Sequence, residues 1–192
     1  MSHSEKVYAL EDATRWLHEY GLVLCPLVNR ICVVGSVRRQ KKAGVHDLEV
    51  LVIPLPSSQM NLFGAPMPGN RLDEEIKRLA QEWNAELLVN GPMTKKLRLV
   101  EGPMLEIYVS TPGRWGVEMV IKTGDADFSH KAVLLRKYGG YLPSNCVIKD
   151  GWKVYRNGNP LPMLEEGDFL ELLGFPADLD PQVRSGKSVP TY

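Results

Sequence analysis

Apolar residues recur along the chain at two different spacings, and each spacing predicts a different kind of element. Where they return every three or four residues, one side of a helix is apolar and can face a core. This spacing predicts amphipathic helices over residues 9–20, 72–83, 115–121, 128–138 and 165–173. Three of these segments are followed directly by Gly21, Gly139 or Gly174, and glycine is common where helices end.

Short runs of β-branched and other apolar residues predict strands, because such side chains pack well on a pleated surface. They lie at residues 30–35, 47–53, 85–89, 95–100 and 105–110. A hairpin is predicted where residues 146–149 and 152–155 flank Asp150-Gly151, since this dipeptide supplies the positive φ values of a tight turn. Residues 54–70 are rich in Pro, Gly, Ser and Met and predict a long loop.

The order of these elements predicts an α+β fold with a mixed β-sheet and flanking helices. After Thr111-Pro112 the composition shifts towards helices and an isolated hairpin. We therefore expect a larger first lobe over residues 1–122 and a small C-terminal α/β-hairpin lobe over residues 123–192. A chain of 192 residues with 44% hydrophobic content is long enough to bury a core.

Charge and cysteine content change this picture only slightly. Lys and Arg together number 23, as do Asp and Glu, so no global field steers the chain towards nucleic acid and any affinity comes from local patches. The three cysteines are widely spaced and odd in number, which favours reduced thiols and a cytoplasmic setting. No apolar run approaches the roughly 18 residues needed to cross a bilayer, and we expect no membrane contact.

Asp47 and Glu49 are the first candidates for chemistry. Successive side chains of a strand point to opposite faces, so these carboxylates share one face while Leu48 and Val50 share the other. Hard oxygen ligands at this spacing bind Mg²⁺ or Mn²⁺, and metal-assisted chemistry on a triphosphate needs a third carboxylate from elsewhere. Alone the pair is a weak signal, because acidic residues two apart on a strand usually form only a solvated face.

The residues before this strand give the pair a context. Gly35-Ser36 follows the preceding strand, Arg38-Arg39 comes next, and Gly44-Val45-His46 leads into Asp47. This order resembles the nucleotidyltransferase signature of DNA polymerase family X, which has Gly-Ser, an arginine pair and then Gly-Asp-apolar-Asp before an apolar strand.

Two downstream segments extend the resemblance, which runs from about Leu10 to Arg184. Leu105-Glu106-Ile107-Tyr108 is similar to the strand that carries the third carboxylate of that family. Thr123-Gly124 with Phe128-Ser129 is similar to its Thr-Gly-x-x-x-Phe-Asn segment beside the bound nucleotide. The chain is similar to the minimal, two-lobed viral form.

The resemblance implies a palm-like nucleotidyltransferase sheet and a thumb-like C-terminal lobe. It implies that Asp47, Glu49 and Glu106 are catalytic and hold two Mg²⁺ or Mn²⁺ ions while a nucleotide is added to a primer 3′-hydroxyl with release of pyrophosphate. The implied contacts with the nucleoside triphosphate are Gly35, Ser36, Arg38, Arg39, Gly124, Phe128 and Ser129. The implied acceptor is DNA, gapped or primer-template as in DNA repair, with RNA as an alternative; we expect a monomer in the cytoplasm, or in that of a host if the chain is viral.

The chain departs from the family pattern at three positions. Glutamate stands at positions 49 and 106 where the family usually has aspartate, and His46 replaces a glycine. One extra methylene moves a carboxylate by about 1.5 Å, and a misplacement of about 1 Å can cost on the order of 10²-fold in rate. Two alternatives therefore stay open: nucleotide transfer to RNA, a protein or a small molecule, and a catalytically silent module that binds nucleic acid or a partner.

Overall fold

The computed structural model describes residues 6–60, 62–63, 67–100 and 102–185, and the chain divides into two compact units. Unit 1 comprises Met1–Val33 and Lys42–Val109, and unit 2 comprises Val34–Lys41 and Ser110–Tyr192. The division therefore falls after Val109 and not at the expected 122/123 boundary, and a short early segment joins the second unit. That segment carries Arg38 and Arg39, whose hydrogen bonds run to Thr123, Gly124 and Glu166.

Unit 1 is built on a five-stranded mixed sheet, which confirms the α+β fold class and all five predicted strands. In order across the sheet the strands are β1 (Val28–Val33), β2 (Asp47–Pro54), β5 (Met104–Val109), β4 (Thr94–Leu99) and β3 (Ala85–Asn90). β2 and β5 are parallel, and every other neighbouring pair is antiparallel. The acidic strand β2 is therefore a neighbour of β5, although the two strands are far apart in the sequence.

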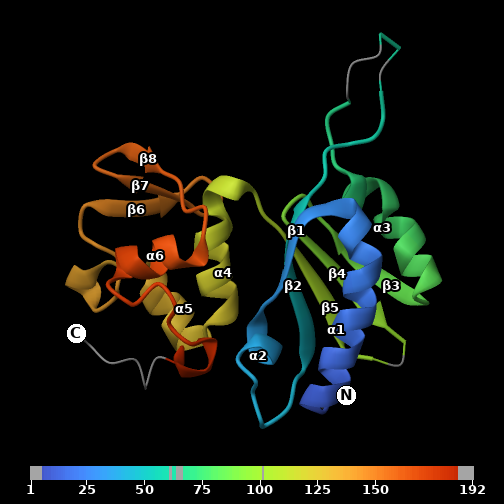
Figure 1. Cartoon of the computed structure of the whole chain (residues 1–192), viewed down its shortest axis with the longest axis horizontal. Coiled ribbons are helices and arrows are strands. Elements are labelled where there is room, and N and C mark those ends of the chain that lie inside the picture. Colours follow the sequence, from blue (N-terminus) through green and yellow to red (C-terminus); the bar gives the residue numbers. More distant parts are fainter. Residues whose placement is uncertain (1–5, 61, 64–66, 101, 186–192) are drawn as a thin grey trace. The chain divides into compact units, whose positions relative to one another are not determined.

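Two helices, α1 (Leu10–Leu24) and α3 (Arg71–Glu82), flank this sheet (Figure 1). A 3₁₀ turn over Cys25–Leu27 joins α1 to β1. α1 is longer than predicted, because it continues through Gly21 to the fully buried Leu24. Glycine costs a helix only about 1 kcal/mol, less than the roughly 1.5–3 kcal/mol gained by burying a leucine.

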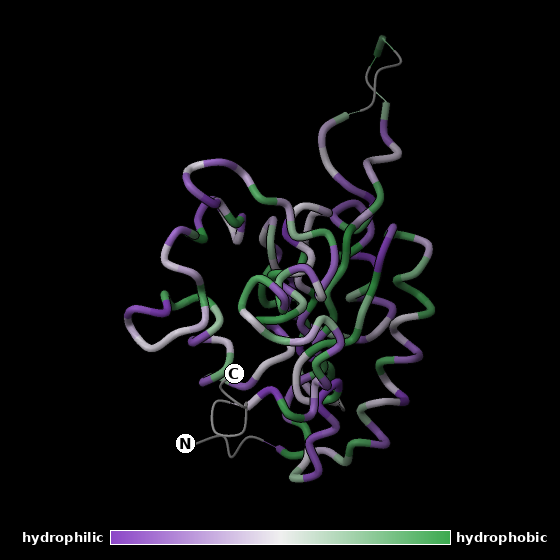
Figure 2. The backbone as a smooth tube through the Cα atoms, turned by 60° about the vertical axis from the view of Figure 1, so that its left-hand side comes forward, coloured by the Kyte–Doolittle hydropathy of each residue, from purple (hydrophilic) through white to green (hydrophobic). Residues whose placement is uncertain are grey.

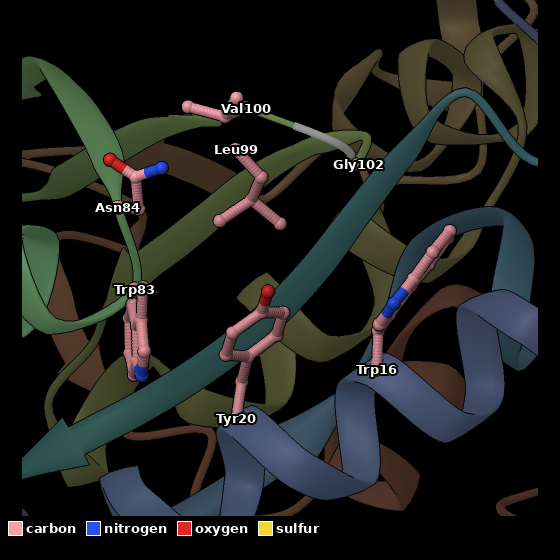
Figure 3. A pocket seen from close by; sticks show the side chains of 7 residues that line it. All are labelled: Trp16, Tyr20, Trp83, Asn84, Leu99, Val100 and Gly102. Carbon is pink, nitrogen blue, oxygen red and sulfur yellow. The ribbon is translucent and has the colours of Figure 1, made fainter.

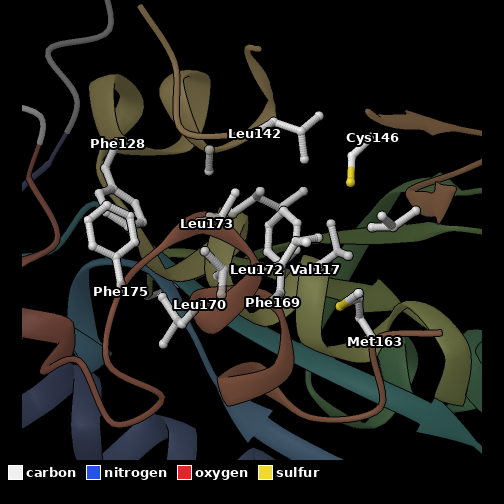
Figure 4. Close-up of a cluster of buried hydrophobic side chains, with 14 residues drawn as sticks. Val117, Phe128, Leu142, Cys146, Met163, Phe169, Leu170, Leu172, Leu173 and Phe175 are labelled. Atoms are coloured by element: carbon white, nitrogen blue, oxygen red, sulfur yellow. The ribbon is translucent and has the colours of Figure 1, made fainter. Parts of the chain in front are cut away.

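Unit 2 combines helices with a small three-stranded sheet. The helices are α2 (Gly35–Arg38), α4 (Trp115–Thr123), α5 (Ala126–Val133) and α6 (Glu166–Leu173), with 3₁₀ turns at Pro112–Arg114, Arg136–Tyr138 and Pro181–Val183. The sheet has the order β6 (Cys146–Lys149), β7 (Lys153–Arg156) and β8 (Asn159–Leu161). The hydrophobic core of unit 2 contains side chains from α4, α5, α6 and the small sheet. Phe128, Phe169 and Phe175 belong to it (Figure 4).

Two local predictions in unit 2 were wrong in detail, and one strand was not predicted. The helix expected over residues 128–138 ends at Val133, because Leu134 and Leu135 adopt extended backbone. The hairpin turn has three residues with positive φ, Asp150, Gly151 and Trp152, and not the two of a type I′ turn. β8 was not predicted, because Pro160 lies in it and proline is tolerated only at a sheet edge.

The hydropathy of the chain follows these elements. Figure 2 shows helical segments that alternate between hydrophobic and hydrophilic stretches, as amphipathic helices do. Within the part of the chain that the structure describes, every helix is too short or too polar to cross a bilayer. All three cysteines lie in that part, and none forms a disulfide.

Candidate functional site

The central feature of unit 1 is a pair of glutamates on neighbouring parallel strands. Glu49 of β2 is paired in register with Glu106 of β5. The residues that flank Glu49, Leu48 and Val50, are buried, whereas the side chains of Asp47, Glu49 and Glu106 are partly exposed. The alternation predicted from the sequence therefore holds, and the acidic residues share one face of the sheet.

The flanking helices cover the opposite face. Lys95 is buried and forms an ion pair with Asp73 of α3, so α3 lies on the face to which Lys95 points. Its neighbour Lys96 points to the other face and is paired in register with Glu106. The glutamate pair therefore lies on the sheet face that α3 does not cover.

A single hydroxyl links the two glutamates. The hydroxyl oxygen of Tyr108 lies 2.5 Å from Glu106 Oε2 and 3.1 Å from Glu49 Oε1. Burial raises the pKa of Tyr108 well above its ordinary value, and the charges of both glutamates and the hydrogen bond to Glu106 raise it further. The hydroxyl therefore stays protonated and acts as a donor, chiefly to Glu106 because that contact is shorter.

Lys96 neutralises part of this negative charge. Its ammonium nitrogen lies 2.5 Å from Glu106 Oε1. Both carboxylate oxygens of Glu106 thus have partners, one cationic and one neutral. Arg98 follows on the same face of β4 and pairs with Glu86 of β3 at 2.8 Å, so two cations lie beside the acidic pair.

The donor chemistry of this face fits a divalent cation. Carboxylate oxygens are the ligands that Mg²⁺ and Mn²⁺ prefer, and Mg²⁺ is commonly held by one or two carboxylates while water and substrate phosphates complete the shell. Glu49 and Glu106 place two carboxylates side by side on this face, and Asp47 precedes Glu49 on the same face. Among residues 6–60, 62–63, 67–100 and 102–185, no three or more Asp, Glu, His or Cys side chains form a metal-ligand group.

The arginines expected to clamp a triphosphate have protein partners within unit 2. Arg38 donates to both oxygens of Glu166, at 2.7 and 2.6 Å, and to the Thr123 hydroxyl at 2.9 Å. Arg39 donates to the carbonyl oxygens of Thr123 and Gly124. Both side chains therefore tie the 34–41 segment to the C-terminal end of α4.

Glu166 is the centre of a partly buried ion network, in which Arg184 is fully buried. It also accepts a hydrogen bond from Arg184 at 2.5 Å. Burial alone would raise the pKa of Glu166, but hydrogen bonds from Arg38 and Arg184 outweigh burial and lower it. Glu166 is therefore held as a carboxylate, and Arg38 would have to leave it in order to bind a phosphate.

The remaining residues expected at the nucleotide occupy two turns of unit 2. Gly35 has a φ of 66° where α2 begins, a left-handed conformation that favours glycine, and Ser36 follows it. Phe128 has no exposed surface and packs against Tyr141 and Phe175, with ring centroids 5.7 and 5.8 Å away. Its ring is thus a core group and offers no surface to a nucleotide here.

Gly124 and Ser129 form a close-packed connection between α4 and α5. A Cβ atom on Gly124 would lie 2.5 Å from the Phe128 ring and 2.9 Å from Ser129 Oγ, so only glycine fits. The Ser129 hydroxyl donates to the Ile121 carbonyl at 2.6 Å. In this structure the motif therefore joins two helices, and its glycine is explained by packing.

A cavity of about 250 Å³ lies in unit 1 on the helix-facing side of the sheet. Three aromatic side chains line it with Leu99, and Tyr20 packs edge-on against Trp83 with ring centroids 4.9 Å apart (Figure 3). Leu99 points to the same face as Lys95, so the cavity and the glutamate pair lie on opposite faces. The cavity is not part of the acidic site.

One member of the acidic site, Tyr108, had not been assigned to it from the sequence. Tyr108 had a detectable signal, because it lies two residues after Glu106 on the same strand and so shares its face. The direct pairing of Lys96 with Glu106 depends on the register of the β4–β5 pair, which the sequence does not specify. In the comparisons with known proteins, no family model and no curated protein matched the chain.

Proposed function

We propose that this chain is a metal-dependent nucleotidyltransferase, and that the sheet of unit 1 corresponds to the palm of DNA polymerase family X. The observation that supports this most is the direct register of Glu49 with Glu106 on parallel neighbours. Like charges directly opposite on adjacent strands destabilise a sheet. A bound cation converts this unfavourable pair into a ligand set.

In this proposal each residue of the acidic face, the sheet face that carries Asp47, Glu49 and Glu106, has a separate role. Glu49, Glu106 and Asp47 hold the cation, which when bound offsets negative charge on phosphoryl oxygens. Tyr108 fixes the spacing of the two glutamates through its hydroxyl. Lys96 and Arg98, which are adjacent cations on the same face of β4, contact phosphates of the substrate.

The proposed acceptor is a primer 3′-hydroxyl of DNA, with a nucleoside triphosphate as donor. Gly35, Ser36 and Arg39 remain the proposed phosphate contacts of unit 2, on the strength of the resemblance to family X. Since the chain carries no net charge, binding of DNA rests on local cations such as Lys96 and Arg98 and weakens steeply with added salt.

A silent binding module is the second candidate, and one observation favours it. Both oxygens of Glu106 already have partners, Lys96 and Tyr108, so the acidic face is satisfied by protein groups alone. Nucleotide transfer to RNA, a protein or a small molecule uses the same cation site and differs from the leading proposal only in the acceptor.

Primer extension tests the proposal directly. Purified protein is given gapped, nicked and single-stranded primers, then labelled triphosphates with RNA and protein acceptors, each with Mg²⁺ or Mn²⁺. We expect extension of a DNA primer, and a loss on the order of 10²-fold or more in Glu49→Gln and Glu106→Gln. Glu86→Gln is the matched control, because it removes an exposed carboxylate from the same sheet, and it should retain activity.

Each outcome of the experiment distinguishes between the candidate functions. Incorporation into RNA or protein alone replaces the acceptor and keeps the chemistry. No incorporation with any acceptor or metal, together with binding of nucleic acid, refutes the transferase and supports the silent module. Activity that survives both glutamine substitutions refutes the assignment of the acidic face.

A further inference from the structure

We propose that Lys96 is a positioning residue that competes with the divalent cation for Glu106 and so sets the affinity of the site for metal. This inference rests on the proposed function, since it concerns the same acidic face. Lys96 is the internal counter-ion of Glu106, and a metal ion binds there by displacing its ammonium group.

The geometry of the ion pair carries the first step. Lys96 and Glu106 are directly opposite in the β4–β5 register, and their charged atoms are 2.5 Å apart. The side chain of Glu106 is only 14% exposed, whereas that of Lys96 is 39% exposed. The carboxylate is therefore fixed in the sheet, and the ammonium group can move into solvent on its flexible stem without a large desolvation cost.

The neighbouring lysine shows what a structural lysine looks like in this strand. Lys95 is 2% exposed, pairs with Asp73 and donates to the Gly91 carbonyl at 2.7 Å. Its ammonium group is enclosed and doubly held. Lys96 has one recorded carboxylate partner and an exposed stem, which suits an exchangeable counter-ion.

Tyr108 distinguishes the two oxygens of Glu106. Its hydroxyl is neutral and partly buried, and it contacts Glu49 as well as Glu106. It adds no positive charge that would repel a cation. Glu106 therefore has one oxygen on a fixed neutral donor and one on a mobile cation, and a metal ion exchanges with the second.

The charges give the direction of the effect. Glu49 and Glu106 together carry two negative charges, and Lys96 offsets one of them. Without the ammonium group an incoming divalent ion meets more negative charge at Glu106 and no longer competes with Lys96 for that carboxylate. Partly exposed ion pairs of this kind are worth up to about 1 kcal/mol, so removing Lys96 should tighten metal binding by about 3- to 5-fold.

Binding of Mn²⁺, followed by the loss of the electron paramagnetic resonance signal of the free ion, tests this without any turnover. We expect Lys96→Met to bind Mn²⁺ about 3- to 5-fold more tightly than the wild type. Lys96→Arg keeps the charge and should restore wild-type affinity. Arg98→Met is the control, because it removes a positive charge from the same face of the same strand, where the partner is Glu86. It should change the Mn²⁺ affinity by less than about 2-fold, because solvent and salt screen exposed charges.

The outcomes separate this inference from the proposed function. If the wild type binds Mn²⁺ and Glu106→Gln abolishes binding, but Lys96→Met binds no more tightly, competition by Lys96 is refuted and the metal site stands. An equal gain in Arg98→Met also refutes it, because the effect would then be general. If no variant shows binding that depends on Glu106, both proposals fall. Circular dichroism checks folding, and Lys96→Gln replaces Lys96→Met if the latter does not fold.

Discussion

Replacing Glu166 with alanine tests how much its ion pairs with Arg38 and Arg184 stabilise unit 2. The substitution removes the carboxylate that accepts hydrogen bonds from Arg38 at 2.6 and 2.7 Å and from Arg184 at 2.5 Å. The Arg184 side chain is only 2% exposed, so its charge would stay buried without its partner. Breaking a buried ion pair from one side costs about 3–5 kcal/mol. Arg184 keeps its hydrogen bonds to the Leu179 carbonyl, which puts the expected loss near 3 kcal/mol.

The pH dependence of the stability provides a second, independent test of this prediction. The pKa of Glu166 is lowered in the folded state from an ordinary value of 4.5. A lowered carboxyl pKa contributes stability that is present above pH about 4.5 and is lost as the pH falls through the folded-state pKa. Glu166→Gln, which has no carboxyl group, lacks this contribution. The stability gap between wild type and Glu166→Gln should therefore be widest near neutral pH and narrow in acid.

Urea unfolding followed by tryptophan fluorescence and circular dichroism measures both effects. Glu171→Ala is the control, because it removes an exposed carboxylate from the same helix, and it should change the free energy of unfolding by less than about 0.5 kcal/mol. Replacing all three charged residues together, as Arg38→Met, Glu166→Leu and Arg184→Met, should cost less than Glu166→Ala alone, since no buried charge is left unpaired. A loss below about 1 kcal/mol in Glu166→Ala, or a gap that widens in acid, would refute the account of the network.

Three further substitutions test separate features by the same unfolding assay. Gly116→Ala should destabilise unit 2 by about 1–3 kcal/mol, because a Cβ atom there would lie 2.0 Å from the Glu165 carbonyl oxygen; wild-type stability would show that this contact is not tight. Asn70→Ala should cost about 1 kcal/mol, because Asn70 caps α3 by accepting from the Asp73 amide at 2.9 Å, and Asn70→Asp should retain most of that stability. Tyr108→Phe should lower stability by about 1–3 kcal/mol, since the paired glutamates lose their shared donor; wild-type stability in this variant would contradict that role.

The sequence by itself determined the elements and their faces where the signal is local. The spacing of apolar residues predicted all five strands of unit 1, and the alternation around Asp47 and Glu49 predicted which side chains share a face. Both follow from neighbours along the chain, because period and side-chain direction are properties of a single strand or helix. Where local and tertiary preferences disagree, as at Leu134, the periodic pattern was misleading.

Only the tertiary structure decided which distant residues meet. It placed Glu106 opposite Glu49 and Lys96 opposite Glu106, through the registers of two strand pairs. It also gave Arg38 a partner in Glu166, 128 residues away. Such pairings depend on the order of strands in a sheet and on packing of segments far apart in the chain, which no local pattern encodes. The sequence thus identified each candidate residue by its type. It did not identify the partner that determines the charge state and mobility of that residue.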